Sequence, residues 1–261
     1  MADENRDSGR GSGRRPMRSY FLCGLNMQKV AECSNYLEDK LRHVNKPFIC
    51  TVQEPPNRKN LNFNPRWLQI LQGKTTAGLP TRVGIVASKD INLTKIPNLC
   101  DRDTVCAVWE TKGCGNTTWN KHRTLIVSGY WERSNSVRTL PKSWEKAADY
   151  GRDQGLEVYF QVDANARSEL FGGTVGPNDT GRRDKLEEFL EKNCLIPVNT
   201  GSTPTWSARG LESVIDLTFA TADLARKLSN YQVHVESNYS DHWMTSTEML
   251  SYPPEREWMR D

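Results

Sequence analysis

The order of apolar segments constrains the fold of this 261-residue chain more than any other feature. Residues 19–27 and 47–54 are apolar runs typical of buried strands, and between them apolar residues recur at helical spacing over 28–43. A strand, a helix and a strand within about 35 residues form a β-α-β unit. We therefore expect the two strands to lie parallel and adjacent in one sheet.

After Pro55 the chain changes to strands with few helices between them. Strands are predicted at 82–88, 104–110 and 124–130, and because no helix separates them we expect them to pair antiparallel. The pattern then predicts helices at 141–153 and 182–193 and strands at 156–163, 214–220, 232–236 and 243–249. These elements predict one α/β domain, a mixed β-sandwich of two sheets flanked by helices.

The ends of the chain differ in composition from its centre. Residues 1–18 are predicted as a disordered basic tail, whose arginines are either solvated or touch nucleic acid or an import receptor. The folded domain is predicted over 19–250, with 251–261 as a C-terminal tail or the start of a linker. The sequence has no secretory leader and no apolar run of about 18 residues, so we expect a non-secreted protein that does not enter a membrane.

The chain has seven cysteines, an odd number, and none of them is in a C-x-x-C pair. This usage is typical of reduced thiols inside a cell. A zinc site formed by Cys100, Cys106, Cys114 and His122 is an alternative, but their spacing matches no common zinc site.

Polar side chains stand at or near the ends of the predicted strands. They are Asn26, Glu54, Asp163, Asn165, Asp216, Asp241 and His242. A strand end holds a side chain rigidly and leaves its tip accessible, as a preorganised site requires. Each residue alone could equally be solvated or part of a turn. Asp216 is different because it interrupts an apolar segment, where a carboxylate must be paired, coordinated or neutralised.

These residue types together favour phosphodiester chemistry. Carboxylate and amide oxygens suit a hard ion such as Mg²⁺ or Mn²⁺. His242 supplies a base that titrates near neutral pH, and a carboxylate such as Asp216 would orient it. A metal, a base and amide donors suit nucleophilic attack on a phosphate diester. The sequence has neither a G-x-x-x-x-G-K-[ST] nor a G-x-S-x-G motif, which disfavours P-loop hydrolases and serine hydrolases.

Seven short motifs then occur in order between residues 20 and 249. They are L-N-M-Q-K at 25–29, V-Q-E-P at 52–55, S-G-Y-W at 128–131, V-D-A-N-A at 162–166, T-P-T-W at 203–206, S-V-I-D-L-T at 213–218 and S-D-H at 240–242. In these motifs the chain resembles the endonuclease/exonuclease/phosphatase superfamily, which has the DNase I-like four-layer α/β sandwich and includes apurinic endonucleases. The Q-E-P and T-P-T-W forms most resemble the endonuclease of non-LTR retrotransposons.

This resemblance implies a Mg²⁺-dependent nick in double-stranded DNA, with Mn²⁺ as a possible substitute and no small-molecule cofactor. The nick would leave a 3′-hydroxyl that primes a reverse transcriptase of the same polyprotein, which implies a nuclear protein. An apurinic-site repair enzyme or another phosphoesterase of the superfamily is the first alternative. A catalytically silent nucleic-acid-binding module is the second.

The resemblance also implies a role for each site residue. Glu54 is the principal metal ligand, assisted by Asn26 and by Asp241 on the metal or leaving-group side. His242 contacts the scissile phosphate or serves as the base and is oriented by Asp216; Asp163 positions or deprotonates the attacking water, and Tyr130 and Asn165 hold phosphate oxygens. The identity of the base stays open between Asp163 and His242.

Two positions depart from the family pattern. Val162 stands where a glycine usually precedes the Asp-x-Asn motif, which adds bulk beside the site. Arg133-Ser134 stands where a proline often follows the tyrosine motif, so the turn is expected to differ and Arg133 to reach DNA.

DNA contacts are expected from the loops around the strand ends. The candidates are Arg58, Lys59, Arg66, Lys112, Trp119, Lys121, Arg123, Arg133, Arg182, Arg183, Thr205, Trp206 and Ser240. Basic side chains in such loops either contact phosphates or are solvated. Trp119 either wedges a base step or packs in the core.

The net charge of only +3 agrees with a local DNA surface. The tail to Arg18 carries five arginines and three acids, which leaves +1 for the rest of the chain. Setting aside the four acids assigned to the site (Glu54, Asp163, Asp216 and Asp241) leaves +5 for the remaining surface. We therefore expect a basic rim around an acidic site, and a modest, salt-sensitive affinity for DNA.

Overall fold

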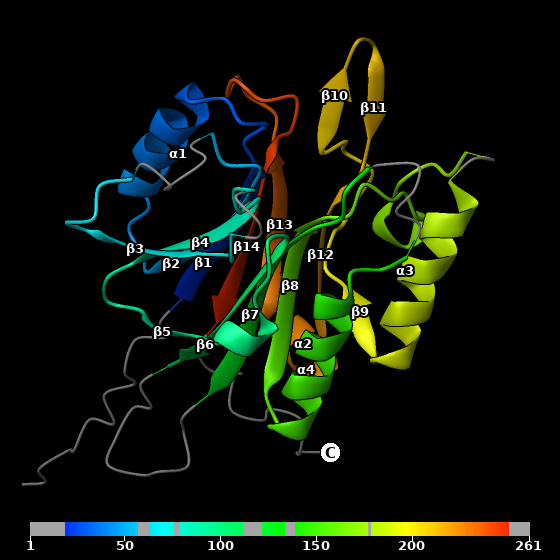
Figure 1. The fold of residues 1–261 in the computed structure, drawn as a ribbon. Helices are drawn as coiled ribbons and strands as arrows, with labels where there is room; N and C mark the ends of the chain where they lie inside the picture. Colours follow the sequence, from blue (N-terminus) through cyan, green and yellow to red (C-terminus); the bar gives the residue numbers. More distant parts are fainter. Residues whose placement is uncertain are drawn as a thin grey trace, which may run out of the picture.

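Two six-stranded sheets pack face to face, with helices on both outer sides (Figure 1). The computed structural model describes residues 19–56, 63–75, 79–111, 122–133, 139–176 and 179–250. The predicted fold class, a two-sheet mixed β-sandwich flanked by helices, is confirmed. The predicted tails at 1–18 and 251–261 lie outside the described residues.

The first sheet carries the N-terminal β-α-β unit. Its strand order is β13 (Leu228–His234), β14 (Met244–Leu250), β1 (Ser19–Asn26), β2 (Phe48–Gln53), β4 (Val83–Ser88) and β3 (Leu68–Gln72). β1 and β2 are parallel neighbours, as predicted, and all other pairs in this sheet are antiparallel. Helix α1 (Glu32–Arg42) connects β1 to β2.

The second sheet contains most of the central strands. Its order is β5 (Asn92–Lys95), β6 (Thr104–Glu110), β7 (Arg123–Tyr130), β8 (Glu157–Asp163), β12 (Asp216–Thr221) and β9 (Leu195–Pro197). β7 and β8 are parallel, joined through helix α2 (Lys142–Asp153), and the other pairs are antiparallel. Three further helical segments are η3 (Glu169–Phe171), α3 (Thr180–Lys192) and α4 (Ala222–Ala225), and a short η1 (Pro97–Leu99) precedes β6.

Three sequence predictions are corrected by the structure. The strand at 82–88 does not pair with the strand at 104–110, because β4 closes a hairpin with β3 in the first sheet and β5 begins the second. The first helix begins at Glu32 rather than at Gln28, since Gln28 and Lys29 have left-handed φ values of 46° and 62°. The short strands β3, β5 and β9 were not predicted, and β10 (Trp206–Ala208) and β11 (Leu211–Ser213) form a separate two-stranded hairpin.

The core divides into two layers of apolar side chains. One layer lies under α1, where Leu37 and Leu41 pack with residues of β1 and β2 such as Cys50 and Val52. The other layer fills the space between the sheets and the space under α2, α3 and α4 on the opposite side of the molecule. Burying these faces accounts for the four-layer order of helix, sheet, sheet and helices.

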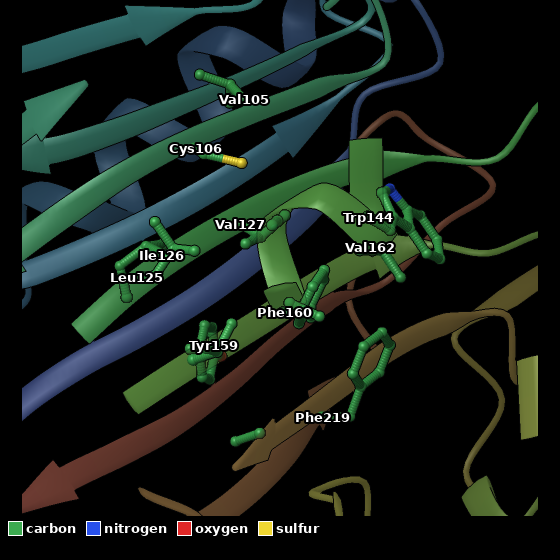
Figure 2. Close-up of a cluster of buried hydrophobic side chains, with 14 of the residues drawn as sticks. Val105, Cys106, Leu125, Ile126, Val127, Trp144, Tyr159, Phe160, Val162 and Phe219 are labelled. Atoms are coloured by element: carbon green, nitrogen blue, oxygen red, sulfur yellow. The ribbon is translucent and has the colours of Figure 1, made fainter. Parts of the chain in front are cut away.

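Aromatic side chains pack against one another in the layer on the second sheet, among them Trp144, Phe160 and Phe219 (Figure 2). Phe160 of β8 and Phe219 of β12 are directly opposite in register, with stacked rings 4.9 Å apart. Trp144 of α2 lies 6.3 Å from Phe160 and 6.4 Å from Phe219 between ring centroids. Such pairs stabilise beyond their buried area by about 0.5–1.5 kcal/mol each, so this cluster fixes β8 and β12 relative to α2.

The space between the sheets becomes polar toward one end. The Gln53 amide donates to Ser128 Oγ at 3.2 Å, and the Gln161 amide contacts Thr245 Oγ1 at 2.8 Å, which bridges the two sheets. A Cβ on Gly24 would lie 2.5 Å from Gln161 Cδ, so the close approach of β1 to β8 requires glycine there. Gln53 and Gln161 lead directly to the strand ends that carry the candidate site residues.

The longest helix in the described ranges, α3, has 13 residues. None of the helices in these ranges has the length and apolar character to cross a bilayer. The six described cysteines are all free thiols, five of them buried.

Candidate active site

The predicted polar residues converge where the carboxyl ends of strands from both sheets meet. Asn26 ends β1 and Glu54 follows β2, and because these strands are parallel both residues lie at the same edge of the first sheet. Asp163 ends β8 of the second sheet. The site is therefore assembled from two sheets rather than from one.

Asn26 connects the two halves of the site. Its Nδ2 donates to Asp163 Oδ2 at 2.8 Å and approaches Glu54 Oε2 at 3.4 Å. Its Oδ1 accepts the backbone N–H of Gln28 at 2.8 Å, which fixes the orientation of the amide. One buried amide thus holds two carboxylates from different sheets near each other.

Asp216 and His242 form a second part of the site beside Asp163. Asp216 begins β12 and stands directly opposite Asp163 in the antiparallel ladder. His242 Nδ1 lies 2.8 Å from Asp216 Oδ2 and 3.1 Å from Oδ1, and both side chains are buried. The predicted Asp216–His242 partnership therefore exists, and Asp216 can orient the imidazole so that Nε2 is the reactive nitrogen.

The proximity of these charges shifts their pKa values. Burial, and then the charge of Asp216, raises the pKa of Asp163 to about 7. Burial lowers the pKa of His242, but attraction to Asp216, Asp163 and Glu54 outweighs it and raises that pKa to about 9. At neutral pH His242 is thus a proton donor paired with Asp216, whereas Asp163 is a carboxylate close to its titration point.

Tyr130 and Asn165 complete the predicted set around Asp163. Tyr130 ends β7 and is the register partner of Asp163 in the parallel ladder. Burial, with the nearby charges of Glu54 and Asp163, raises the pKa of Tyr130, so its hydroxyl stays protonated. Asn165 Nδ2 donates to Asp163 Oδ2 at 3.2 Å and to the Trp131 carbonyl at 3.0 Å. Asn165 has a φ of 43° and follows the end of β8, so its backbone is left-handed and not extended.

The S-D-H segment is fastened to the end of β1. Ser240 Oγ donates to the Asn26 carbonyl at 2.7 Å and accepts the His242 backbone N–H at 3.1 Å. The Gln28 amide binds Asp241 twice, donating to Oδ2 at 3.0 Å and accepting the backbone N–H at 3.1 Å. Asp241 is thus placed beside Asn26 through Gln28, a residue that the sequence interpretation did not single out.

Backbone strain gathers at this edge of the sandwich. Among the described residues, eight non-glycine residues have a positive φ, and five of these lie in or next to the site: Gln28, Lys29, Glu54, Asn165 and Tyr239. Each such conformation costs about 1–3 kcal/mol and persists where the surroundings enforce it. Strain at a cluster of polar side chains is typical of a functional site.

The donor set fits a hard divalent cation. The Glu54 side chain is 15% exposed and has Lys29 as its ion-pair partner at 3.2 Å, although the Lys29 side chain is 67% exposed. Ligand atoms of Asp163, Asp216 and His242 also lie within 4.8 Å of one another, and all three are buried. Carboxylate and amide oxygens suit Mg²⁺ and Mn²⁺, whereas an imidazole that binds Asp216 through Nδ1 is better placed as a proton donor.

Val162, which replaces the usual glycine, lies inside β8. It is buried between Leu217 of β12 and Gly129 of β7 in the sheet. Its side chain therefore belongs to the apolar core, and the change to the special backbone conformation occurs later, at Asn165.

The predicted DNA contacts that lie away from the site, or outside the described residues, form a first group. Arg58, Lys59, Lys112, Trp119 and Lys121 lie outside the described residues, as does Cys114 of the alternative zinc set. Arg123 begins β7, the strand that Tyr130 ends, and pairs with Glu110 at 3.3 Å. Arg66 precedes β3 at the edge that is next to Ser88, opposite to the Glu54 edge. The structure does not bring Arg66 or Arg123 to the site.

A second group lies near Tyr130. The Arg182 guanidinium stacks over the Trp131 ring at 4.2 Å and donates to the carbonyls of Trp131 and Glu132. Burial lowers the pKa of Arg182 to about 10, and the charge of Arg133 acts in the same direction. Arg182 pairs with no carboxylate among the described residues, whereas Arg183 pairs with Asp184 at 2.7 Å.

The third group is the β10–β11 hairpin and its anchor. Thr205 is fully buried, and its Oγ1 accepts the backbone N–H groups of Ile215 and Asp216 at 3.0 and 2.9 Å. Thr205 therefore holds Asp216 in place instead of facing solvent. Trp206 is half-buried and forms an isolated β-bridge with His242, which places the hairpin beside the site (Figure 1).

Sequence reasoning also missed Arg82, which lies immediately before β4. Its backbone carbonyl accepts the Glu54 N–H at 2.7 Å, and its guanidinium lies 4.7 Å from the Tyr130 ring centroid. No motif marks Arg82, because its partners come from other strands. A basic residue at the start of an apolar strand was the only available signal.

Comparisons with known proteins agree with this fold. Residues 124–246 match a family described as endonuclease-reverse transcriptase. The endonuclease domain of TRAS1, a telomere-specific non-LTR retrotransposon, is similar with a TM-score of 0.69 and 22% identity, covering 88% of this chain and 98% of that one. The catalytic domain of Xenopus laevis APE2 has a TM-score of 0.67 at 11% identity, covering 90% and 94%. The AP endonuclease LMAP from Leishmania major has a TM-score of 0.66 at 10% identity, covering 90% and 89%. The search of curated proteins gave no match.

The fold is a two-sheet sandwich with the buried cluster of Asp163, Asp216 and His242 at one edge. The chain resembles the endonuclease/exonuclease/phosphatase superfamily in its fold, and residues 124–246 carry the match to the endonuclease-reverse transcriptase family.

Proposed function

We propose that this chain is a Mg²⁺-dependent endonuclease that nicks double-stranded DNA and leaves a 3′-hydroxyl for reverse transcription. The observation that carries the proposal is the convergence of Asn26, Glu54 and Asp163 with the Asp216–His242 pair at one edge of the sandwich. Positioning and charge neutralisation supply most of the catalysis in phosphate transfer.

The side chains divide the work of hydrolysis by their protonation states. Asp163 is suited to orient the attacking water and take its proton, since its pKa of about 7 matches neutral pH. His242, charged and held by Asp216, is suited to donate Nε2–H to a phosphate oxygen. Tyr130 and Asn165 are suited to hold the remaining phosphate oxygens.

A divalent ion would be held by Glu54, assisted by Asn26 and Asp241, with Mn²⁺ as a possible substitute for Mg²⁺. The bound ion would supply Lewis-acid stabilisation of the charge that develops on the phosphate. The protein's contribution is to keep these oxygens on rigid strand ends, where little reorganisation accompanies the reaction.

Support for DNA as substrate comes from the charges beside the site. Arg133 is exposed and therefore available for a phosphate. The Arg182 guanidinium is held by Trp131 and backbone carbonyls, and its charge, which no acid among the described residues pairs with, adds positive potential there. The similar TRAS1 domain is an endonuclease of a non-LTR retrotransposon. We therefore propose a reverse transcriptase of the same polyprotein as partner, and a nuclear location.

A repair activity at abasic sites is the second candidate, because two of the similar structures are an AP endonuclease and the APE2 catalytic domain. The two candidates differ in what they cleave. A retrotransposon-type enzyme should nick intact duplex, whereas a repair enzyme should cleave an abasic oligonucleotide far faster than the intact one.

The direct test is nicking of supercoiled plasmid with Mg²⁺ by the wild type, Glu54→Ala and His242→Ala. We expect nicking by the wild type and none by Glu54→Ala or His242→Ala. A DNA polymerase should extend the nicks, and EDTA should prevent nicking. His43→Ala is the matched control, because His43 is exposed at the end of α1. Metal-dependent nicking that survives both substitutions would refute the assigned site, and a strong preference for abasic DNA would favour repair.

A further inference from the structure

The site draws its side chains from two sheets, so something must fix the sheets relative to each other at this edge. Asn26 does so between Glu54 and Asp163. On the Tyr130 side the corresponding contact comes from Arg82, a residue of the first sheet that reaches the second. Arg82 is only 6% exposed, although it is charged.

The backbone of Arg82 contacts Glu54 directly. The Glu54 N–H donates to the Arg82 carbonyl at 2.7 Å, and the Arg82 N–H donates to the Arg102 carbonyl at 2.8 Å. Glu54 has a left-handed φ of 42°, which glutamate seldom adopts without support. The bond to Arg82 is therefore part of what holds the carboxylate in place.

The guanidinium of Arg82 crosses to the second sheet. It binds Asp103, immediately before β6, through Nε and through Nη2 at 2.6 Å, and it pairs with Glu132 at 2.9 Å. Its plane lies 4.7 Å from the centroid of the Tyr130 ring. The Tyr130 N–H in turn donates to the Asp103 carbonyl at 2.8 Å. These contacts form a continuous chain that runs from Glu54 through Arg82 and Asp103 to Tyr130.

Stability alone does not explain this arrangement. Burying the guanidinium costs desolvation energy that often equals its attraction to the partly exposed Asp103 and Glu132 carboxylates. The forked, planar guanidinium instead fixes geometry, because it binds Asp103 with two nitrogens and stacks on a ring at the same time. A lysine would keep the charge but lose both constraints.

We propose that Arg82 is a positioning residue that sets Tyr130 and Glu54 relative to each other across the two sheets. The proposal rests on the proposed function for its catalytic consequence. It implies that the nicking rate and the affinity for a divalent ion both depend on the shape of the Arg82 side chain, beyond its charge.

The experiment compares Arg82→Lys with Arg102→Lys, a matched control. Arg102 is half-exposed, and its Nε donates to the Pro80 carbonyl. Arg102→Lys changes the side chain alone, so the backbone carbonyl that accepts the Arg82 N–H is kept. We measure Tm without metal, the shift of Tm on adding Mn²⁺, and kcat and KM for nicking. We expect Arg82→Lys to lower kcat at least about tenfold, because a misplacement of about 1 Å can cost about 10²-fold. KM should change little and the Mn²⁺ concentration for a half-maximal Tm shift should rise, while Arg102→Lys behaves as wild type.

A double mutant separates positioning from general damage to the fold. If Arg82 acts through Tyr130, Arg82→Lys/Tyr130→Phe should be no slower than the slower single mutant, because both changes remove the same placement. Losses that multiply while Mn²⁺ binding is unchanged, or an Arg82→Lys enzyme that loses only Tm and keeps kcat and Mn²⁺ binding, would overturn the proposal.

Failure of the proposed function has a different signature. If the wild type does not nick DNA, that function is refuted and the Mn²⁺ shift alone decides the role of Arg82. A weaker Mn²⁺ response in Arg82→Lys than in Arg102→Lys then supports the positioning role through Glu54, and an equal response overturns it.

Discussion

Strands β8 and β12 carry two cross-strand pairs of opposite character, three residues apart. Phe160 and Phe219 are stacked in the core, and Asp163 and Asp216 face each other at the site. All four side chains are buried. An aromatic pair stabilises a sheet, whereas like charges placed directly opposite destabilise it. The same ladder is therefore a scaffold at one point and a strained active centre three residues further on.

The difference shows how the acid pair is tolerated. The surrounding structure offsets the repulsion with His242, with the Asn26 amide and with the Thr205 hydroxyl, which holds the Asp216 backbone. A residual cost remains, since the pKa of Asp163 is raised to about 7. We expect substitutions in the aromatic pair to change stability, and those in the acid pair to change activity.

The largest effect is expected for Asp216→Asn. The new amide can donate to His242 Nδ1 and would select the wrong tautomer, so nicking should slow by about 10²–10⁴-fold. Asp223→Asn, in the exposed Asp223–Arg226 pair of α4, is the control and should leave the rate unchanged. Near wild-type nicking by Asp216→Asn would show that the pair is structural only.

Phe160→Ala is the matching change in the apolar pair. Removal of a buried aromatic side chain should cost about 3–5 kcal/mol, which for a domain of this size is a fall in Tm of about 6–20 °C. Nicking at a temperature where the variant is folded should stay within a few-fold of wild type. Calorimetry measures the fall in Tm, with Leu170→Ala as the control because Leu170 is exposed. A large loss of rate in folded protein would erase the contrast between the two pairs.

Substitution of Thr205 is expected to lower both stability and activity. Thr205→Val removes the hydroxyl that accepts the Ile215 and Asp216 N–H groups and should cost about 1–3 kcal/mol. It should also slow nicking, because Asp216 loses its backbone anchor. Thr205→Ser keeps the hydroxyl and should restore both properties in denaturation and nicking assays. If Val and Ser behave alike, the hydroxyl does not position Asp216.

The smallest effect is the pH dependence of metal stabilisation. Because the folded pKa of Asp163 is raised from 3.8 to about 7, its contribution to stability is fully present below pH 3.8 and is lost as pH rises through 7. A divalent ion offsets that loss, so Mg²⁺ should raise Tm more at pH 8 than at pH 5.5. At a Mg²⁺ concentration tenfold above Kd the gain is about 1.4 kcal/mol. A shift that is equal at both pH values, or absent in wild type, would contradict the metal site.

Most of the fold follows from local sequence patterns. The β-α-β unit at 19–54 and the long strands ending at Tyr130 and Asp163 were predicted because apolar period and turn residues are local signals. The sheet in which residues 82–88 pair was not predicted, because strand pairing depends on residues far apart in the chain. The short strands β3, β5 and β9 also lack enough periodic residues to be distinguished from loops.

The candidate site was likewise predicted where motifs mark its residues and missed where only tertiary contacts define them. Asn26, Glu54, Asp163 and the Asp216–His242 pair were predicted from motifs and are brought together by the structure. Thr205 was interpreted as a DNA contact, but the structure buries it. Arg82 and Gln28 were not singled out, because their importance comes from tertiary partners that no spacing in the sequence reveals.

Asp163→Asn tests the contrast between the two pairs most directly, with metal-free Tm and nicking rate measured on one preparation. The substitution removes a buried charge opposite Asp216 and keeps the shape of the side chain. We predict a Tm close to that of wild type, because relief of the repulsion from Asp216 offsets the hydrogen bond lost from Asn26 or Asn165. The nicking rate should be at least about 10²-fold lower, as expected for loss of a general base. A lowered Tm with nicking retained would contradict it, because Asp163 would then belong to the scaffold and the catalytic centre would lie elsewhere.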